Sequence, residues 1–447
     1  MNARPAWAAL ACAALACAAA SPARAGESPA DSTMHSYFRA LSDSTDAYFG
    51  LSAQPADTAG LDSALAAGLA RPPGMAPRGA LRLSLAPAFS FNRALGAVYG
   101  GSAALGLGRA PNRLAGQLQW ANGPNQWYGG GELLLGRARP RQDASVTLSV
   151  SGGRRFEALN RDRYSSGFAT LNALVWGSDR HSYLRRDGVR AELAHRGAAG
   201  WSALAYRWEL ESPLSTTAGW TLTGAGLEVE ANAPAVFGRA SELSVSAGAR
   251  LPWAPFAAEA TLWNAGGALG GDLAYHRYRA AFGGGIPLGA HLALAPQLEY
   301  ARLRGAPLAQ DALYVGGSYS LLTVPSQSLA GTGRAIARVD LLLQDDVPTL
   351  LGLRRNPAFP LQAGVFATTA ARWGFDPASG APRIVARNWP RAGEWMPEAG
   401  LSLMYRPGLP DPETWLRVDY AWPLGPGDRD ATLYVSWKRT LHLLSGR

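Results

Sequence analysis

From residue 80 onward the sequence repeats one pattern, in which about ten residues alternate between apolar and polar before a turn or loop follows. Side chains alternate across a β-strand, so each such stretch has one apolar face and one polar face. The clearest stretches are residues 81–92, 146–151, 189–193, 227–232, 243–250, 416–422 and 433–438. The pattern predicts an all-β chain built from antiparallel strands.

The length of these stretches separates two all-β architectures. Strands of a soluble sandwich usually have about 5–6 residues, whereas a tilted strand that crosses a bilayer needs about 9–11. In lipid every backbone amide must be paired, so membrane strands close into a barrel. At roughly 20–24 residues for a strand and its loop, residues 80–447 predict an antiparallel transmembrane β-barrel of about 16 strands. A soluble β-sandwich or propeller is the alternative.

Composition agrees with strands rather than helices. After residue 25 no uninterrupted apolar run approaches the ~18 residues of a membrane helix. The 52 glycines and 31 prolines also interrupt the chain too often for long helices. Trp and Tyr number 15 each, and both residue types concentrate where protein meets lipid headgroups.

The first 25 residues have the form of a secretory signal peptide. Arg4 precedes an apolar stretch at 6–20, which leads to the small-x-small tripeptide Ala-Arg-Ala. Cleavage after Ala25 would leave Gly26 as the first mature residue. An uncleaved membrane helix or a lipoprotein leader that uses Cys17 are the alternatives.

The mature chain that this cleavage predicts has no cysteine, because Cys12 and Cys17 both lie in the leader. Disulfides therefore cannot stabilise it, whereas a closed, hydrogen-bonded barrel could. Of its charged residues, 40 are basic and 33 acidic, once Arg4 and Arg24 are removed with the leader. The resulting excess of positive charge is modest for a chain of this length.

Residues 26–79 differ from the rest of the chain. Residues 57–69 have helical composition, and an Arg-Pro-Pro-Gly sequence ends them. We therefore expect three parts: a signal peptide (1–25), a short N-terminal periplasmic or plug segment (26–79) and an outer-membrane barrel (80–447). The N-terminal segment is either briefly helical or disordered.

Several segments, in order, resemble the bacterial surface antigen superfamily, which contains the BamA- and TamA-like barrels of outer-membrane assembly and secretion. The similar segments are the first hairpin (91–96), two later strands (361–366 and 398–401), the penultimate strand (415–424) and the last strand (432–441). The resemblance implies a barrel over roughly residues 80–441. It also implies a role in moving or inserting polypeptides or lipids at the outer membrane.

One loop of that superfamily reads roughly G-G-x-x-S-L-R-G-Y, and its arginine pairs with acidic residues of the lumen wall. Gly316 and Gly317 fit the start of this frame, but Leu322 stands where the arginine is expected. The loop-locking charge is therefore missing. Residues 26–79 are also too few for even one periplasmic module of the POTRA type.

The sequence offers no enzyme site. The six histidines include no pair spaced i,i+3 or i,i+4, and neither HExxH nor Gly-x-Ser-x-Gly occurs. Asp179, His181 and Ser182 allow a barrel hydrolase as an alternative, with a polar loop as the simpler interpretation. We expect no catalytic residue, no cofactor and no metal, and we interpret the glycine runs at 129–131 and 283–285 as strand kinks.

Charged residues on the polar faces are the candidate functional residues. They have mixed sign, and they either pair with one another to fill the barrel or line a selective pore. The main candidates are Arg334, Arg338, Asp340, Arg417 and Asp419.

Two functions remain open. The first is protein or lipid transport or assembly, with outer-membrane lipids and a polypeptide or partner protein as partners and no nucleic acid. Substrate would pass a weak seam between the first strand (81–91) and the last (432–441). The alternative is a passive pore, or a structural barrel that anchors a periplasmic partner and has no insertase activity.

Overall fold

The computed structural model describes residues 82–439 with internal gaps. The gaps are 108–111, 140–143, 159–172, 176–178, 180–182, 198, 216, 219, 224–234, 252–255, 307–308, 318–319, 325–328, 344, 353–360, 377–382, 406–413 and 426–428. The predictions for the signal peptide and its Ala25–Gly26 cleavage site, for segment 26–79 and for a strand at 227–232 lie outside the described residues.

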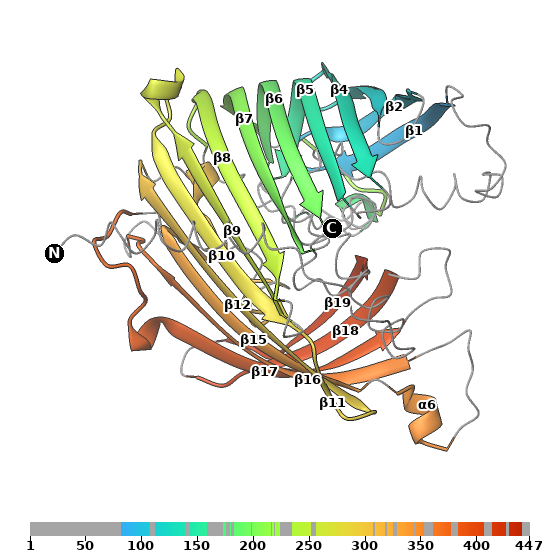
Figure 1. Ribbon diagram of the computed structural model, residues 1–447, viewed down its shortest axis with the longest axis vertical. Helices are drawn as coiled ribbons and strands as arrows, with labels where there is room; N and C mark the ends of the chain where they lie inside the picture. Colours follow the sequence, from blue (N-terminus) through green and yellow to red (C-terminus); the bar gives the residue numbers. More distant parts are fainter. Residues whose placement is uncertain are drawn as a thin grey trace.

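The described chain is one antiparallel sheet of 17 strands with a separate two-stranded hairpin (Figure 1). The sheet contains β1 (Arg82–Asn92), β2 (Gly96–Gly106), β3 (Arg113–Ala121), β4 (Gln126–Arg139), β5 (Ala144–Ala158), β6 (Tyr183–Gly197), β7 (Gly200–Pro213), β8 (Gly238–Arg250), β9 (Phe256–Ala265), β10 (Tyr275–Gly284), β11 (Ile286–Leu288), β12 (Leu292–Gly305), β15 (Gly333–Leu343), β16 (Leu361–Trp373), β17 (Trp395–Tyr405), β18 (Thr414–Pro423) and β19 (Thr432–Arg439). The hairpin is β13 (Leu313–Val315) with β14 (Leu329–Gly331). The all-β, antiparallel prediction is confirmed.

Each long strand pairs with the next long strand along the chain, from β1–β2 to β18–β19. The short β11 pairs with β12, as β10 does, so it continues β10 after a break at Gly285. The sheet curls on itself, but no pairing joins β1 to β19 within the described residues. The structure therefore does not complete the closed barrel that the sequence predicts, and the strand number of such a barrel stays a prediction.

The first turn shows how local sequence ends a strand. Asn92 Oδ1 accepts hydrogen bonds from the amides of Ala94 (3.1 Å) and Leu95 (2.8 Å), which closes a tight turn after β1. Gly96 then has a φ of 68°, a left-handed conformation that favours glycine. β2 starts at this glycine.

β5 extends beyond its alternating stretch in the sequence. That stretch covers residues 146–151, whereas the strand runs from Ala144 to Ala158. Gly153 pairs with Gly130, and a Cβ on Gly153 would lie 2.2 Å from the carbonyl oxygen of Gly129. The glycines therefore bring two strands close together instead of ending one.

Consecutive antiparallel strands place alternate connections at the same end of a sheet. The four longest connections, 159–182, 214–237, 306–332 and 374–394, all fall at one end, which we call the loop end. The opposite end has mostly short connections, such as 198–199 between β6 and β7. Of the helices that the structure describes, none is long and apolar enough to cross a membrane.

Candidate functional site: the enclosed polar face and its loop

The two faces of the sheet have opposite polarity. The convex face carries large apolar side chains in the open, for example Leu85 at 73% exposure and Leu262 at 57%. The enclosed face carries buried polar and charged side chains. These include Glu132, Glu192, Glu209, Glu211, Glu242, Ser244, Thr261, Arg338, Asp340, Thr368, Glu398, Ser402, Arg417 and Asp419. A soluble β protein has the reverse arrangement, with apolar residues enclosed.

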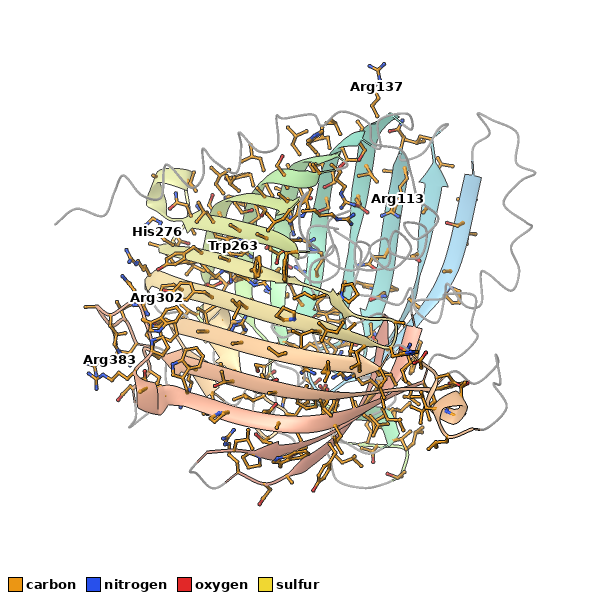
Figure 2. The ribbon with its side chains drawn as sticks, turned by 60° about the horizontal axis from the view of Figure 1, so that its bottom comes forward. Arg113, Arg137, Trp263, His276, Arg302 and Arg383 are labelled. Carbon is orange, nitrogen blue, oxygen red and sulfur yellow. The ribbon has the colours of Figure 1, made fainter. Side chains whose placement is uncertain are left out.

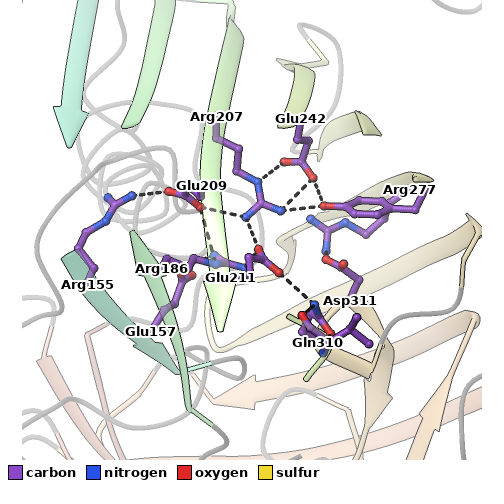
Figure 3. A network of polar contacts seen from close by, with 12 residues as sticks. Arg155, Glu157, Arg186, Arg207, Glu209, Glu211, Glu242, Arg277, Gln310 and Asp311 are labelled. Carbon is purple, nitrogen blue, oxygen red and sulfur yellow. Dashed lines mark hydrogen bonds and ion pairs between the residues drawn. The ribbon is translucent and has the colours of Figure 1, made fainter. Parts of the chain in front are cut away.

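The largest charged group on the enclosed face surrounds Arg207 of β7 (Figure 3). Arg207 Nη1 lies 3.3 Å from Glu209 and 3.2 Å from Glu211 on the same strand. Its Nε lies 3.0 Å from Glu242 on β8, and its Nη2 donates to the Tyr275 hydroxyl at 2.7 Å. Alternate residues of β7 thus place two carboxylates beside one guanidinium.

The group continues onto β5 and β6. Arg186 of β6 lies 3.1 Å from Glu211 and pairs with Glu157 of β5. Arg155 of β5 pairs with Glu209. We call this set the Arg207 cluster: Arg155, Glu157, Arg186, Arg207, Glu209, Glu211, Glu242, Tyr275 and Arg277. The positive and negative side chains alternate through it, so the buried charges compensate one another.

The loop between β12 and β15 reaches this cluster at a short 3₁₀ turn, Ala309–Asp311. Gln310 Nε2 donates to Glu211 Oε2 at 3.2 Å, and Asp311 lies 3.8 Å from Arg277. Gln310 also exchanges two 3.0 Å hydrogen bonds with the backbone of Val236. One side chain therefore joins the sheet wall to two connections of the loop end.

Asp311 carries an altered acidity. Burial, together with the nearby negative charge of Glu211, raises its pKa to about 6, although Arg277 opposes the rise. Asp311 is only 2% exposed. Its charge therefore changes in a pH range where an ordinary aspartate stays ionised.

A second charged group lies on β15, β17 and β18. Arg338 donates two 2.7 Å hydrogen bonds to Asp340, and Arg417 reaches the same carboxylate at 3.2 Å. Arg417 also lies 2.6 Å from Asp419 and donates to Ser402 at 2.7 Å. We call this set the Arg417 cluster: Arg338, Asp340, Ser402, Arg417 and Asp419. It brings together four of the five candidate charges.

The fifth candidate, Arg334, lies apart from this cluster. It pairs with Glu299 of β12, which also lies 2.6 Å from Arg279 of β10. Arg334 Nη1 donates to the carbonyl oxygen of Tyr314 at 3.0 Å. Arg334 therefore links β13 of the small hairpin to β15 of the main sheet.

The glycine-rich part of the same loop folds onto the enclosed face. Gly316 and Gly317 have φ values of 122° and 84°, and Gly317 donates to the carbonyl of Leu321 at 2.7 Å. Leu322, at the position where the resemblance expected arginine, is 5% exposed and packs against Phe366 of β16. An apolar contact thus replaces the expected charge.

Glu398 of β17 holds the tip of this turn. Its two carboxylate oxygens accept the amides of Leu322 and Thr323, both at 3.0 Å, and the hydroxyl of Thr323 at 2.9 Å. Arg429 adds a 3.1 Å bond to the same hydroxyl. The carboxylate therefore binds loop backbone, for which no arginine is needed.

Neither Glu398 nor the Arg207 cluster was among the site residues predicted from the sequence. Glu398 lay within a segment quoted only for its family resemblance. For Arg207, a usable signal was present, because Arg207, Glu209 and Glu211 alternate over one strand. Their partners on β5, β6 and β10 are far apart in sequence.

Of the residues for a hydrolase, only Asp179 lies within the described part of the chain. Its carboxylate accepts the amide of Arg93 at 2.9 Å and the hydroxyl of Tyr183 at 3.1 Å. It therefore has a structural role beside the first turn. The described residues also contain no group of three or more His, Cys, Asp or Glu placed to hold a metal ion.

Comparison with known proteins leaves the family open. No family model matches the sequence, and no curated protein matches it. Among solved structures, CdiB from Acinetobacter baumannii is 11% identical with a TM-score of 0.37. The match covers 80% of this chain and 64% of CdiB, so the chain spans under two thirds of that protein.

Two further structures are similar at the same low level. OccK2 (OpdF) from Pseudomonas aeruginosa is 13% identical with a TM-score of 0.33, and the match covers 79% of this chain and 93% of OccK2. Wzi from Escherichia coli, an outer membrane protein involved in group 1 capsule assembly and a carbohydrate-binding β-barrel, is 11% identical with a TM-score of 0.30. That match covers 84% of each chain.

Proposed function

We propose that this chain is an outer-membrane β-barrel that takes part in protein or lipid transport or assembly at that membrane. The observation that carries the proposal is the inverted polarity of the curled sheet. Leu85 and Leu262 on its convex face are open to the surroundings, whereas charged side chains fill its enclosed face. Only a lipid surrounding makes such a surface favourable over many strands.

The loop end would then face the outside of the cell. Bacterial barrels have short periplasmic turns and longer external loops, and the four longest connections share one end of this sheet. Loop 306–332 would fold from that end into the lumen. Gln310 and Leu322 reach the enclosed face at two separate places, so we infer a resting barrel whose lumen is narrowed by its own loop.

A route for substrate that avoids this loop is the seam between β1 and β19. Among the described residues β1 pairs only with β2 and β19 only with β18, so each has one long edge without a paired neighbour. A strand edge of this kind can pair with an incoming strand. The superfamily resemblance of the sequence gives the seam its proposed role in transport.

The test is a quantitative outer-membrane proteome and lipid profile after deletion of the gene, with complementation by locked variants. Because Cys12 and Cys17 lie in the predicted leader, a pair such as Ala88→Cys and Tyr434→Cys introduces the only thiols of the mature chain. The matched control is Ser90→Cys with Val98→Cys, which joins two strands that are already paired. Selective loss of surface proteins or lipids, restored by the control but not by the oxidised seam pair, is expected.

An unchanged profile after deletion would overturn the transport role. The second candidate, a structural barrel or passive pore, would then remain. The two attachments of loop 306–332 favour this candidate as well, since they hold the loop without the superfamily's arginine. Conductance of the refolded barrel in planar bilayers distinguishes a pore from a closed anchor.

A further inference from the structure

The connection between β16 and β17 folds back over the convex face at the loop end. The Tyr300 hydroxyl of β12 donates to the carbonyl of Asn388 at 2.5 Å, and Arg304 donates to the side chain of Asn388 at 3.0 Å. The ring of Trp389 stacks on Tyr300 with centroids 5.5 Å apart and planes at 11°. These contacts fix described residues of the connection on the outer surface of the sheet.

The residues brought together there form a patch, which we call the rim patch. It consists of Tyr278, Tyr300, Arg302, Arg304, Arg383, Arg387, Trp389, Arg391, Glu394 and Trp395. Figure 2 shows Arg302 and Arg383 at the same margin of the molecule, with His276 close by.

One strand crosses from an apolar to a basic surface within this region. Leu298, Tyr300, Arg302 and Arg304 are alternate residues of β12, so they follow one another on its convex side. Leu298 is 54% exposed. The order along the strand toward the loop end is apolar, aromatic and then basic, which matches acyl chain, interface and headgroup of a lipid leaflet.

The rim patch has an excess of positive charge. Arg302 is 1% exposed, and its guanidinium donates to the Thr332 hydroxyl at 3.3 Å and to the Val385 carbonyl, with no carboxylate partner among the described residues. Carbonyl and hydroxyl groups bind a guanidinium without neutralising it. The sheet therefore holds a fixed positive charge, that of Arg302, at its loop end.

The other arginines add to this charge. Arg304, Arg383 and Arg391 are exposed. Glu394 is the only carboxylate in the rim patch, and Arg387 binds both of its oxygens. The pair leaves three exposed arginines and one buried arginine to attract an anion.

We propose that the rim patch binds the phosphate groups of an anionic glycolipid in the leaflet at the loop end. This inference rests on the proposed membrane location. Arginine binds phosphate through two parallel N–H groups. Nearly all side-chain cations of this sequence are arginines, since Lys438 is its only lysine. The exposed ring of Trp389 and the half-buried ring of Tyr300 lie beside the arginines, where they would contact the sugar and the first carbons of the acyl chains.

The test is lipid retention by the refolded full chain. The barrel is inserted into phosphatidylcholine vesicles that contain bisphosphorylated lipid A, or the same lipid without its phosphates, and bound lipid is counted by native mass spectrometry. Arg304→Gln with Arg383→Gln is the test variant. Arg137→Gln is the matched control, because Arg137 is also exposed but lies near the opposite end of β4 (Figure 2).

Each neutralised arginine is expected to weaken retention of the phosphorylated lipid about fivefold, with no change for the dephosphorylated lipid. The Arg137→Gln control should retain lipid as the wild type does. Equal retention by all variants, or retention that ignores the phosphates, would overturn the inference. Loss of retention when inorganic phosphate is added at low millimolar concentration would also overturn it, since it would indicate a free-anion site.

If the chain is not located in a membrane, the same vesicle experiment gives a different result. A chain that is not a membrane barrel would not insert into either kind of vesicle, and its electrophoretic mobility would not change on heating. A chain that inserts and folds but shows no phosphate preference would contradict the rim patch alone. The two proposals can therefore fail separately.

Discussion

Loop 306–332 is attached to the enclosed face at two places that use different chemistry. At the Arg207 cluster, a loop side chain, Gln310, binds a wall carboxylate, Glu211. Near the Arg417 cluster, a wall carboxylate, Glu398, binds the loop backbone at Leu322 and Thr323. The first attachment depends on the side chain of Gln310, whereas the second consists mainly of hydrogen bonds from loop amides, with one more from the Thr323 hydroxyl.

This difference also separates the two charged clusters. Arg207 contacts three buried carboxylates, those of Glu209, Glu211 and Glu242. In the Arg417 cluster, two arginines face two aspartates. The first cluster should therefore be the more sensitive of the two to loss of one arginine.

The largest effect is expected for Arg207→Met. Removing the guanidinium takes the salt-bridge partner from buried Glu242 and one of the partners from Glu209 and from Glu211, and this should lower the free energy of unfolding by about 3–5 kcal/mol. The midpoint of urea unfolding in lipid vesicles measures the loss. Arg154→Met is the control, since Arg154 is 47% exposed and its pair with Asp187 should contribute about 1 kcal/mol or less. Equal midpoints for the two variants would contradict the role of Arg207.

The second largest loss of stability is expected for Glu398→Ala. It removes the acceptor of two buried amides, which should destabilise the loop attachment by about 2–4 kcal/mol. Hydrogen exchange at Leu322 and Thr323 should become at least about tenfold faster. Thr323→Ala keeps both amide bonds and removes only the two bonds of the hydroxyl, to Glu398 and from Arg429, and should cost about 1 kcal/mol. If exchange is unchanged in Glu398→Ala, the loop is held by Leu322 and its apolar contacts instead.

A smaller effect is expected for Gln310→Ala. The substitution removes the bond to Glu211 and both bonds to Val236, and should cost about 1–2 kcal/mol. Exchange should accelerate at residues 309–311 and stay unchanged at 322–323. Acceleration at both places would show that the two attachments act as one unit.

The smallest effect is a pH dependence of the attachment of loop 306–332 at the Arg207 cluster. The folded pKa of Asp311 is raised to about 6, so between about pH 4 and 6 the folded state binds more protons than the unfolded state. Stability should therefore rise as the pH falls from 7 to 5.5, by roughly 1 kcal/mol or less. Exchange at residues 309–312, corrected for its intrinsic pH dependence, measures the change. Asp311→Asn should abolish it, and an opposite slope would contradict the assigned cause.

The all-β fold could be predicted from the alternation of apolar and polar residues, because this alternation recurs in many separate stretches of the chain. Residues 243–250 and 416–422 alternate apolar and polar side chains, and they form β8 and β18. The limits of β5 could not be predicted in the same way. The alternating stretch ends at residue 151, but the strand continues through Gly153, where the backbone of Gly129 and Gly130 approaches too closely for a side chain.

The candidate site was predictable in part. Arg338 with Asp340, and Arg417 with Asp419, lie two residues apart, so their shared face follows from the period of a strand. That Arg417 reaches across to Asp340 at 3.2 Å does not follow, because β15 and β18 are separated in the sheet by two strands. Curvature of the whole sheet sets that distance.

The sequence alone determined that the chain forms long antiparallel strands with one apolar and one polar face, because side-chain alternation is a local property of the strand. It also showed that one connection carries two successive glycines, Gly316 and Gly317, where a turn is favoured. Only the tertiary structure decided which face is enclosed, and that Glu398 and Glu211 hold that connection. Those contacts join residues 75 or more positions apart, and their distances depend on how all the intervening strands pair and curl.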